Sequence, residues 1–140
     1  MERYRFLEHT ADAKFQAYGK TLEEAFSNAA LALTDIVVEQ KDVESVLQKK
    51  IEIESETKES LLYDFLEKLL YFIDAEHFII ANIVSLNIKK GVKYKLTATL
   101  AGDLGIEKYE FKTAVKAMTY NEMIIQDKPG NSMVQVVLDL

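Results

Sequence analysis

The residues best suited to chemistry lie near the two ends of the chain. Glu8, His9 and Asp12 fall within five residues, in a segment that separates two runs of alternating polar and apolar residues. All three side chains can bind protons or metal ions, and loops attached to a sheet often carry functional residues. The alternative is a structural role, with Asp12 bonded to its own backbone in an Asx turn and His9 an ordinary polar residue. The segment alone favours neither interpretation.

The C-terminal end adds two further negative groups. Residues 136–140 form an apolar run interrupted only by Asp139, which predicts a last strand inside a sheet with Asp139 at its end. Asp139 would then lie beside the terminal carboxylate of Leu140, and the two negative charges would repel each other. A divalent cation that prefers oxygen, such as Ca²⁺ or Mg²⁺, would relieve this repulsion, and a third carboxylate would improve the site. In the alternative, both groups are solvated at a frayed strand end.

Other kinds of catalytic site find little support. The chain has no cysteine, which excludes disulfides, thiolate metal sites and a cysteine nucleophile. With only two histidines, His9 and His77, zinc and copper are disfavoured. The sequence contains no glycine-rich phosphate loop, no dinucleotide fingerprint and no nucleophile elbow. His77 falls at the end of a predicted helix, where it can interact with the negative end of the helix dipole.

Two helices are predicted to support these ends. The first covers 21–38 and begins with a capping box formed by Thr21 and Glu24. The second covers 58–76. Their apolar residues recur at helical spacing, at Leu22, Ala25, Phe26, Ala29, Ala30 and Leu33, and at Leu61, Leu62, Phe65, Leu66, Leu69, Phe72 and Ile73.

The remaining segments alternate between polar and apolar residues and are predicted to be strands. They comprise 14–17, 51–54, 84–88, 92–100, 109–113, 123–125 and 134–138. Turn residues at 89–91 and 127–131 join late strands into hairpins. The order predicts a single α+β domain over 1–140, with a mainly antiparallel sheet and the helices packed on a face of it.

The charge of the chain limits its partners. A net charge of −6 and a pI near 5.0 disfavour extensive binding to nucleic acid, whose phosphates carry the same sign. The same charge suits a basic partner protein or a cation, or simply keeps the protein in solution. The N-terminal residues do not resemble a signal peptide and no stretch is long enough to span a bilayer, so a cytoplasmic protein without a membrane partner is expected.

Three blocks of the chain resemble the archease family. The first comprises 6–12, 17–19 and 21–26, the second 115–120, and the third 136–140. The total length is also similar, so the resemblance spans the whole chain. It implies a fold of strand–helix–strand–strand modules, one inserted in the other.

The resemblance also implies a divalent-metal site. Its ligands would be Asp12, Asp139 and the terminal carboxylate of Leu140, with Ca²⁺ the ion expected in crystals and Mg²⁺ or Mn²⁺ as alternatives. His9 and Lys116 would contact a partner or a phosphate group. For Lys116 the alternative is an ordinary outward-facing lysine on a strand.

By the same resemblance, the protein is an activator and not an enzyme. The family acts on the RNA-splicing ligase that joins 2′,3′-cyclic-phosphate and 5′-hydroxyl ends in tRNA splicing. It promotes guanylylation of the ligase by GTP and repeated turnover, and tRNA-modifying enzymes are further candidate partners. One departure concerns Asn121, since many members carry histidine there, and asparagine cannot titrate near neutral pH.

Three alternatives remain open at the level of sequence. One is a small metal-dependent hydrolase centred on Asp12, Asp139 and His9. Another is a chaperone-like adaptor for RNA-modifying proteins, and the third is a scaffold whose acidic loop merely stabilises the fold.

Overall fold

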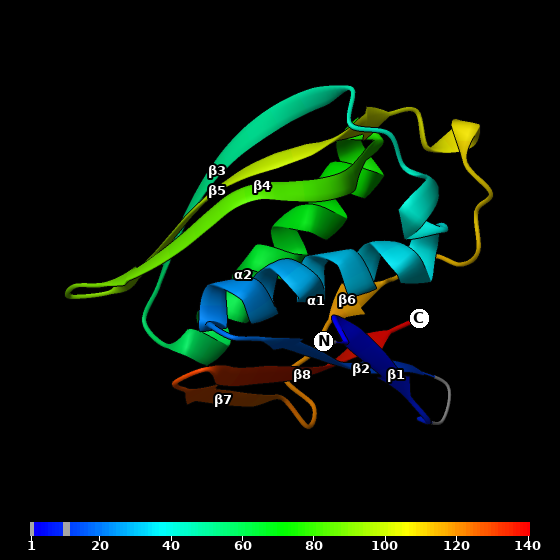
Figure 1. Cartoon of the computed structure of the whole chain (residues 1–140). Helices are drawn as coiled ribbons and strands as arrows, with labels where there is room; N and C mark the ends of the chain where they lie inside the picture. Colours follow the sequence, from blue (N-terminus) through cyan, green and yellow to red (C-terminus); the bar gives the residue numbers. More distant parts are fainter. Residues whose placement is uncertain (1, 10–11) are drawn as a thin grey trace.

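A computed structural model describes residues 2–9 and 12–140 of the chain (Figure 1). Thr10 and Ala11, which belong to the first block of the sequence resemblance, lie outside the described residues. The two long helices are α1 (Leu22–Val37) and α2 (Lys58–Tyr71). The strands are β1 (Tyr4–Leu7), β2 (Asp12–Gly19), β3 (Leu47–Ser55), β4 (Phe78–Lys90), β5 (Tyr94–Leu104), β6 (Ala117–Met118), β7 (Ile124–Lys128) and β8 (Asn131–Asp139).

The strands form two antiparallel sheets with the helices between them. One sheet has the order β1-β2-β8-β6, with β7 also paired to β8, and the other has the order β3-β5-β4. Figure 1 shows α1 and α2 as the middle layer. The three-stranded sheet and α2 form one strand–helix–strand–strand module, which is inserted in the chain between α1 and β6.

The α+β class and the antiparallel pairing are confirmed, but the expectation that the helices cover a face of one sheet is wrong. The reason lies in α1, which is buried around most of its circumference and so can pack on two sheets at once. Its alanines are small enough to let both sheets approach closely, and they are fully buried at Ala25, Ala29, Ala30 and Ala32.

Both predicted helices are confirmed to within a few residues. Thr21 caps α1 by accepting a hydrogen bond from the Glu24 amide at 3.1 Å, and Thr57 caps α2 in a reciprocal arrangement with Ser60. The last predicted turn of the second helix continues as a π-helix, Phe72–Glu76. His77 then ends it in the left-handed conformation, with φ 55, and its amide donates to the Phe72 carbonyl.

Two strand predictions differ from the structure. The segment 109–113 forms no strand and makes only an isolated bridge between Phe111 and Val38. It instead belongs to the connection between the two sheets, and the Tyr109 hydroxyl there donates to Asp103 at 2.6 Å. In contrast, β4 begins at Phe78, well before the predicted 84, because its first three residues are all buried and show no alternation.

None of the described helices is both long and apolar enough to cross a membrane.

Candidate functional site

The two aspartates from opposite ends of the chain meet at one end of the β2–β8 pair. The register places Asp12 directly opposite Asp139. Directly paired residues in an antiparallel sheet project their side chains from the same face, with Cα atoms about 4.5–5.5 Å apart. Leu140 follows at the end of β8 and is partly exposed. The structure thus brings together the three residues predicted as metal ligands.

These carboxylates have little compensating positive charge. Within residues 2–9 and 12–140, the Asp139 side chain forms no ion pair. Asp12 lies beside His9, whose Nδ1 is 3.5 Å from Asp12 Oδ2, and the Asp12 side chain is 27% exposed. Two facing carboxylates of this kind form an oxygen donor set that suits a hard divalent cation.

The described side chains alone do not complete a metal site. The part of the chain that the structure describes contains no group of three or more histidine, aspartate or glutamate side chains with the geometry to hold a metal ion. Any further oxygens would therefore come from the Leu140 carboxylate, the backbone or water. The buried Nδ1 of His9 has no hydrogen-bond partner among the described residues, so the polar surroundings of Asp12 are incompletely satisfied.

A second cluster, centred on Glu122, lies beside the aspartates. One carboxylate oxygen of Glu122 is 2.8 Å from His9 Nε2, and the other accepts a hydrogen bond from Lys14 Nζ at 3.0 Å. The Lys14 ammonium and then the His9 ring hold the pKa of Glu122 below its ordinary value of 4.5. Glu122 itself has φ 52, a left-handed conformation that non-glycine residues seldom adopt. The Gln135 amide side chain donates to its carbonyl at 2.7 Å and helps to hold this turn in place.

Lys116 lies on the other side of β8. Its backbone N–H donates to the Asp139 carbonyl at 2.8 Å, and the next residue, Ala117, pairs with Asp139 in β6. The Lys116 side chain is exposed. Asn121 is also exposed, and its backbone N–H donates to Thr119 Oγ1 at 3.2 Å within the turn that presents Glu122.

Sequence reasoning missed Lys14 and Glu122. A signal was available for Lys14, because residues two apart on a strand share a face and Lys14 follows Asp12 at that spacing. Glu122 had no comparable signal. Its contacts with His9 and Lys14 join residues more than 100 positions apart, and its turn uses a backbone conformation that a glutamate does not predict.

The Glu122 cluster predicts a pH-dependent contribution to stability. Because the pKa of Glu122 is lower in the folded chain, its carboxylate should stabilise the fold above pH 4.5, and this contribution is lost as the pH falls through the folded-state pKa. The difference in melting temperature between wild type and Glu122→Gln should therefore be widest above pH 4.5 and close in acid. Carbon-detected NMR titration should also show that Lys14→Gln raises the pKa of Glu122.

The exposed Glu59, which forms no ion pair among the described residues, provides the control through Glu59→Gln. A stability difference for Glu122→Gln that did not vary with pH would contradict the assigned contacts.

Comparisons with known proteins identify relatives of the whole chain. The model of the archease protein family matches residues 4–140. A protein archease from Thermococcus kodakarensis is 43% identical over 142 residues and covers 100% of both chains. Another from Pyrobaculum calidifontis is 41% identical over 139 residues, which is 98% of this chain and 95% of that protein.

Solved structures agree with these matches. The solution structure of Methanobacterium thermoautotrophicum protein 1598 has 39% identity and a TM-score of 0.85, and the match covers 100% of both chains. The crystal structure of a Thermotoga maritima archease, described as a possible chaperone, has 21% identity and a TM-score of 0.61 over 96% of this chain and 94% of that one. At that identity the second structure shows the common fold alone.

Proposed function

The chain belongs to the archease family, and from this premise we propose that it is an accessory protein that activates an RNA-splicing ligase. In this role it performs no reaction itself. It promotes guanylylation of the ligase by GTP, so that the ligase can act repeatedly in tRNA splicing. The setting is the cytoplasm, and the GTP is consumed by the partner.

The observation that carries this proposal is the direct pairing of Asp12 with Asp139 at the end of the β2–β8 pair. Two facing carboxylates without a lysine or arginine partner among the described residues repel each other, and a bound cation would relieve this cost. We infer that Asp12, Asp139 and the terminal carboxylate of Leu140 hold a divalent cation, with Ca²⁺ or Mg²⁺ best suited to oxygen donors. When bound, such a cation neutralises phosphate charge of the kind that develops in phosphoryl transfer.

The residues around the aspartates support a role in docking. Asp12 and Asp139 mark one end of the β2–β8 pair, here called the acidic end. Next to it, His9 and Lys14 both contact Glu122, which lies in the turn before β7. The Lys116 backbone N–H donates to the Asp139 carbonyl, and the Lys116 side chain is exposed. In the proposed complex, Lys116 and His9 contact the ligase or a phosphate group of GTP.

The test is ligase guanylylation followed with labelled GTP, in the presence of Mg²⁺ and without RNA. The purified chain should increase the rate and extent of labelling of a ligase from the same source. Absence of stimulation with a competent ligase would refute the proposal.

Two controls separate the competing functions. Hydrolysis of phosphate esters by the chain alone would favour a metal-dependent hydrolase. Stimulation that survives Asp12→Ala would instead favour a chaperone-like adaptor that needs no metal.

A further inference from the structure

A second polar site lies at the other end of the β2–β8 pair. The pairing runs from Asp12 and Asp139 at one end to Gly19 and Ser132 at the other, a distance of about 23 Å at 3.3 Å per residue. A cavity of about 480 Å³ opens there. It is lined by lysines from four separate segments of the chain, namely Lys20, Lys58, Lys90 and Lys128.

The charge in this cavity is predominantly positive. Lys58 pairs with Asp127 at 3.0 Å, and so these two lining residues neutralise each other. In the described part of the chain, Lys20, Lys90 and Lys128 form no ion pair. The remaining acidic residue in the lining is Glu23, so three uncompensated ammonium groups face one carboxylate.

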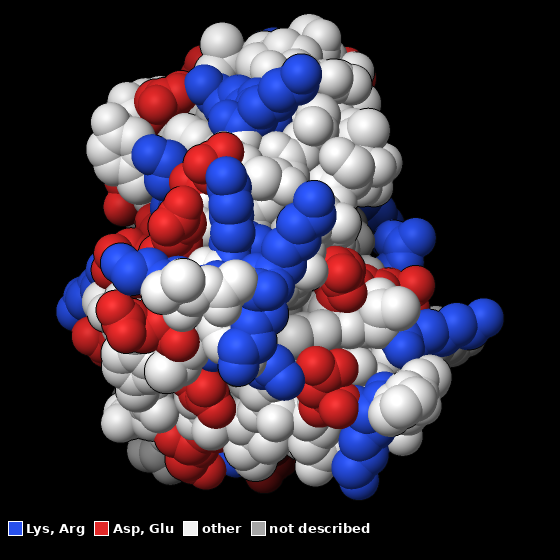
Figure 2. All heavy atoms as spheres, turned by 90° about the vertical axis from the view of Figure 1, so that its left-hand side faces the viewer, with Lys and Arg blue, Asp and Glu red and all other residues white. Residues whose placement is uncertain are grey.

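The positive charge continues from the cavity along the β4–β5 hairpin. Lys89 lies on it without an ion pair among the described residues, whereas Lys93 and Lys95 pair with Glu56 at 3.9 Å and with Glu52 at 3.2 Å. This end of the molecule therefore holds seven of the 17 lysines and arginines in a chain whose net charge is −6, and three of the seven, Lys58, Lys93 and Lys95, are in ion pairs. Figure 2 shows lysine and arginine side chains gathered at the centre of the face toward which the hairpin points. The lysines outside ion pairs among the described residues, Lys20, Lys89, Lys90 and Lys128, carry the positive charge from the cavity onto the hairpin.

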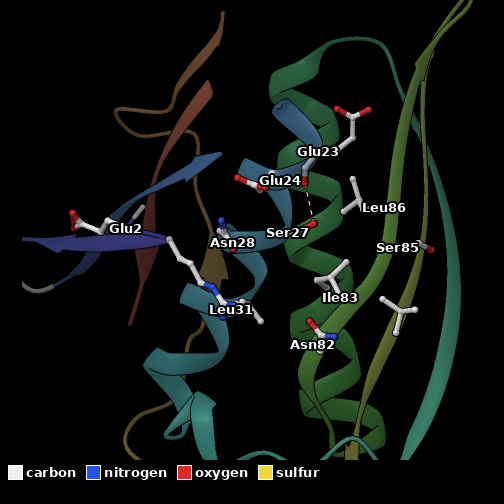
Figure 3. Close-up of a pocket in the computed structure, with 12 residues that line it drawn as sticks. Glu2, Glu23, Glu24, Ser27, Asn28, Leu31, Asn82, Ile83, Ser85 and Leu86 are labelled. Atoms are coloured by element: carbon white, nitrogen blue, oxygen red, sulfur yellow. Dashed lines mark hydrogen bonds between the residues drawn. The ribbon is translucent and has the colours of Figure 1, made fainter. Parts of the chain in front are cut away.

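A second cavity of similar size has the opposite character. It measures about 450 Å³ and lies between α1 and the free edge of β4 (Figure 3). Its charged lining residues are Glu2, Glu23 and Glu24 against one arginine, Arg3. An anion would be repelled from this cavity, so the positive charge does not extend over the whole surface.

We propose that the lysine-lined cavity and the adjoining hairpin, here called the basic end, bind the phosphate backbone of a single-stranded RNA segment. Lysine ammonium groups bind phosphate as point charges, and the three unpaired ones come from segments that the fold holds apart around an open cavity. Tyr94 also lines the cavity, with its ring centroid 5.1 Å from Lys90 Nζ, and supplies an aromatic surface of the kind on which bases stack.

The choice of RNA over another phosphate polymer rests on the proposed function, since the partner ligase acts on RNA ends. The basic end lies opposite the acidic end, so one molecule can face the ligase with Asp12 and Asp139 while the RNA strand runs over its far side. The net charge of −6 limits this contact to a few phosphates and excludes extensive binding.

The test is binding of a fluorescently labelled oligouridylate to the chain alone, measured by anisotropy in a chelator, so that a metal at the acidic end does not contribute. With three or four phosphate contacts, the affinity should fall by roughly 20- to 50-fold between 50 and 200 mM salt. The double variant Lys90→Glu/Lys128→Glu should bind at least about tenfold more weakly at 50 mM salt, with a shallower salt dependence. Both lysines are exposed, so folding should be unaffected, as circular dichroism will verify.

The matched control is Lys41→Glu/Lys50→Glu, which changes the charge equally at two exposed positions outside the cavity and should alter binding less than about twofold. Absence of RNA binding at 50 mM salt, or equal loss in both double variants, would overturn the proposal. Binding of tripolyphosphate without binding of RNA would assign the site to a small phosphate compound instead. Guanylylation with GTP contains no RNA, so it should be stimulated equally by wild type and Lys90→Glu/Lys128→Glu, which separates this test from that of the activator function.

Discussion

Asp139→Asn should remove both metal binding and activation of the ligase while leaving the fold intact. Loss of one of the two facing carboxylates should lower the affinity for a divalent cation by more than 10- to 100-fold, which is the loss typical of residues that only support a metal ligand. Guanylylation should then fall at least about tenfold at limiting metal. Asp12→Asn should behave in the same way, because Asp12 is the direct cross-strand partner of Asp139.

Thermal unfolding gives a second measurement that does not depend on the ligase. At a Ca²⁺ concentration of about 100 times the dissociation constant, the wild-type chain should gain about 2.7 kcal/mol, or roughly 5–10 °C in melting temperature. Asp139→Asn should gain nothing. In chelator the sign reverses, and the variant should be as stable as wild type or slightly more so, because the repulsion between Asp12 and Asp139 is gone.

The matched control is Asp74→Asn, since Asp74 is exposed on the π-helical turn and forms no ion pair among the described residues. It should retain the metal-dependent rise in melting temperature and full stimulation. If wild type and Asp139→Asn responded equally to Ca²⁺, the metal site would lie elsewhere. If Asp139→Asn lost metal binding but kept stimulation, the adaptor function would replace the metal-dependent one.

Phe65→Ala should lower the free energy of unfolding by about 3–5 kcal/mol, which is among the largest stability effects expected for a single substitution in this chain. Phe65 on α2 stacks on Phe26 of α1, with ring centroids 6.2 Å apart and planes 18° from parallel. Both side chains are fully buried in the layer of helices between the two sheets. Because both helices are enclosed by sheets, the surrounding structure can collapse only partly into the space left by the ring.

Urea denaturation followed by circular dichroism will measure this loss. Tyr71→Ala on the same helix is the control, because the Tyr71 side chain is 53% exposed, and it should cost less than about 1 kcal/mol. Equal costs for the two variants would show that the two sheets do not enclose the helices as described.

The helices and the β4–β5 hairpin were predictable because their signals are local. Periodicity and the capping residue Thr21 located α1, and a lysine–glycine turn located the hairpin. The segment 109–113 carried the same alternating pattern as a true strand. That it forms no strand is a tertiary effect, because both sheets are built from other segments and this one connects one sheet to the other.

The candidate site was predictable only in part. Asp12, Asp139 and Leu140 stood out by residue type, but nothing within either end of the sequence indicates that the two ends meet. That meeting depends on β2 and β8 pairing in one register, and a shift by a single residue would turn Asp139 to the opposite face. The contacts of Glu122 and the four lysines that line the cavity were likewise not predictable, because each cluster brings together side chains from separate segments.

The sequence by itself determined both helices and most strands of this protein, its α+β class, its family and the residue types available for chemistry. These follow from spacing over a few residues, where backbone geometry alone relates one side chain to the next. The tertiary structure decided that the helices lie between two sheets, that Asp12 faces Asp139, and that lysines from four segments surround one cavity. Those arrangements depend on packing and strand register between distant parts of the chain, which local spacing does not encode.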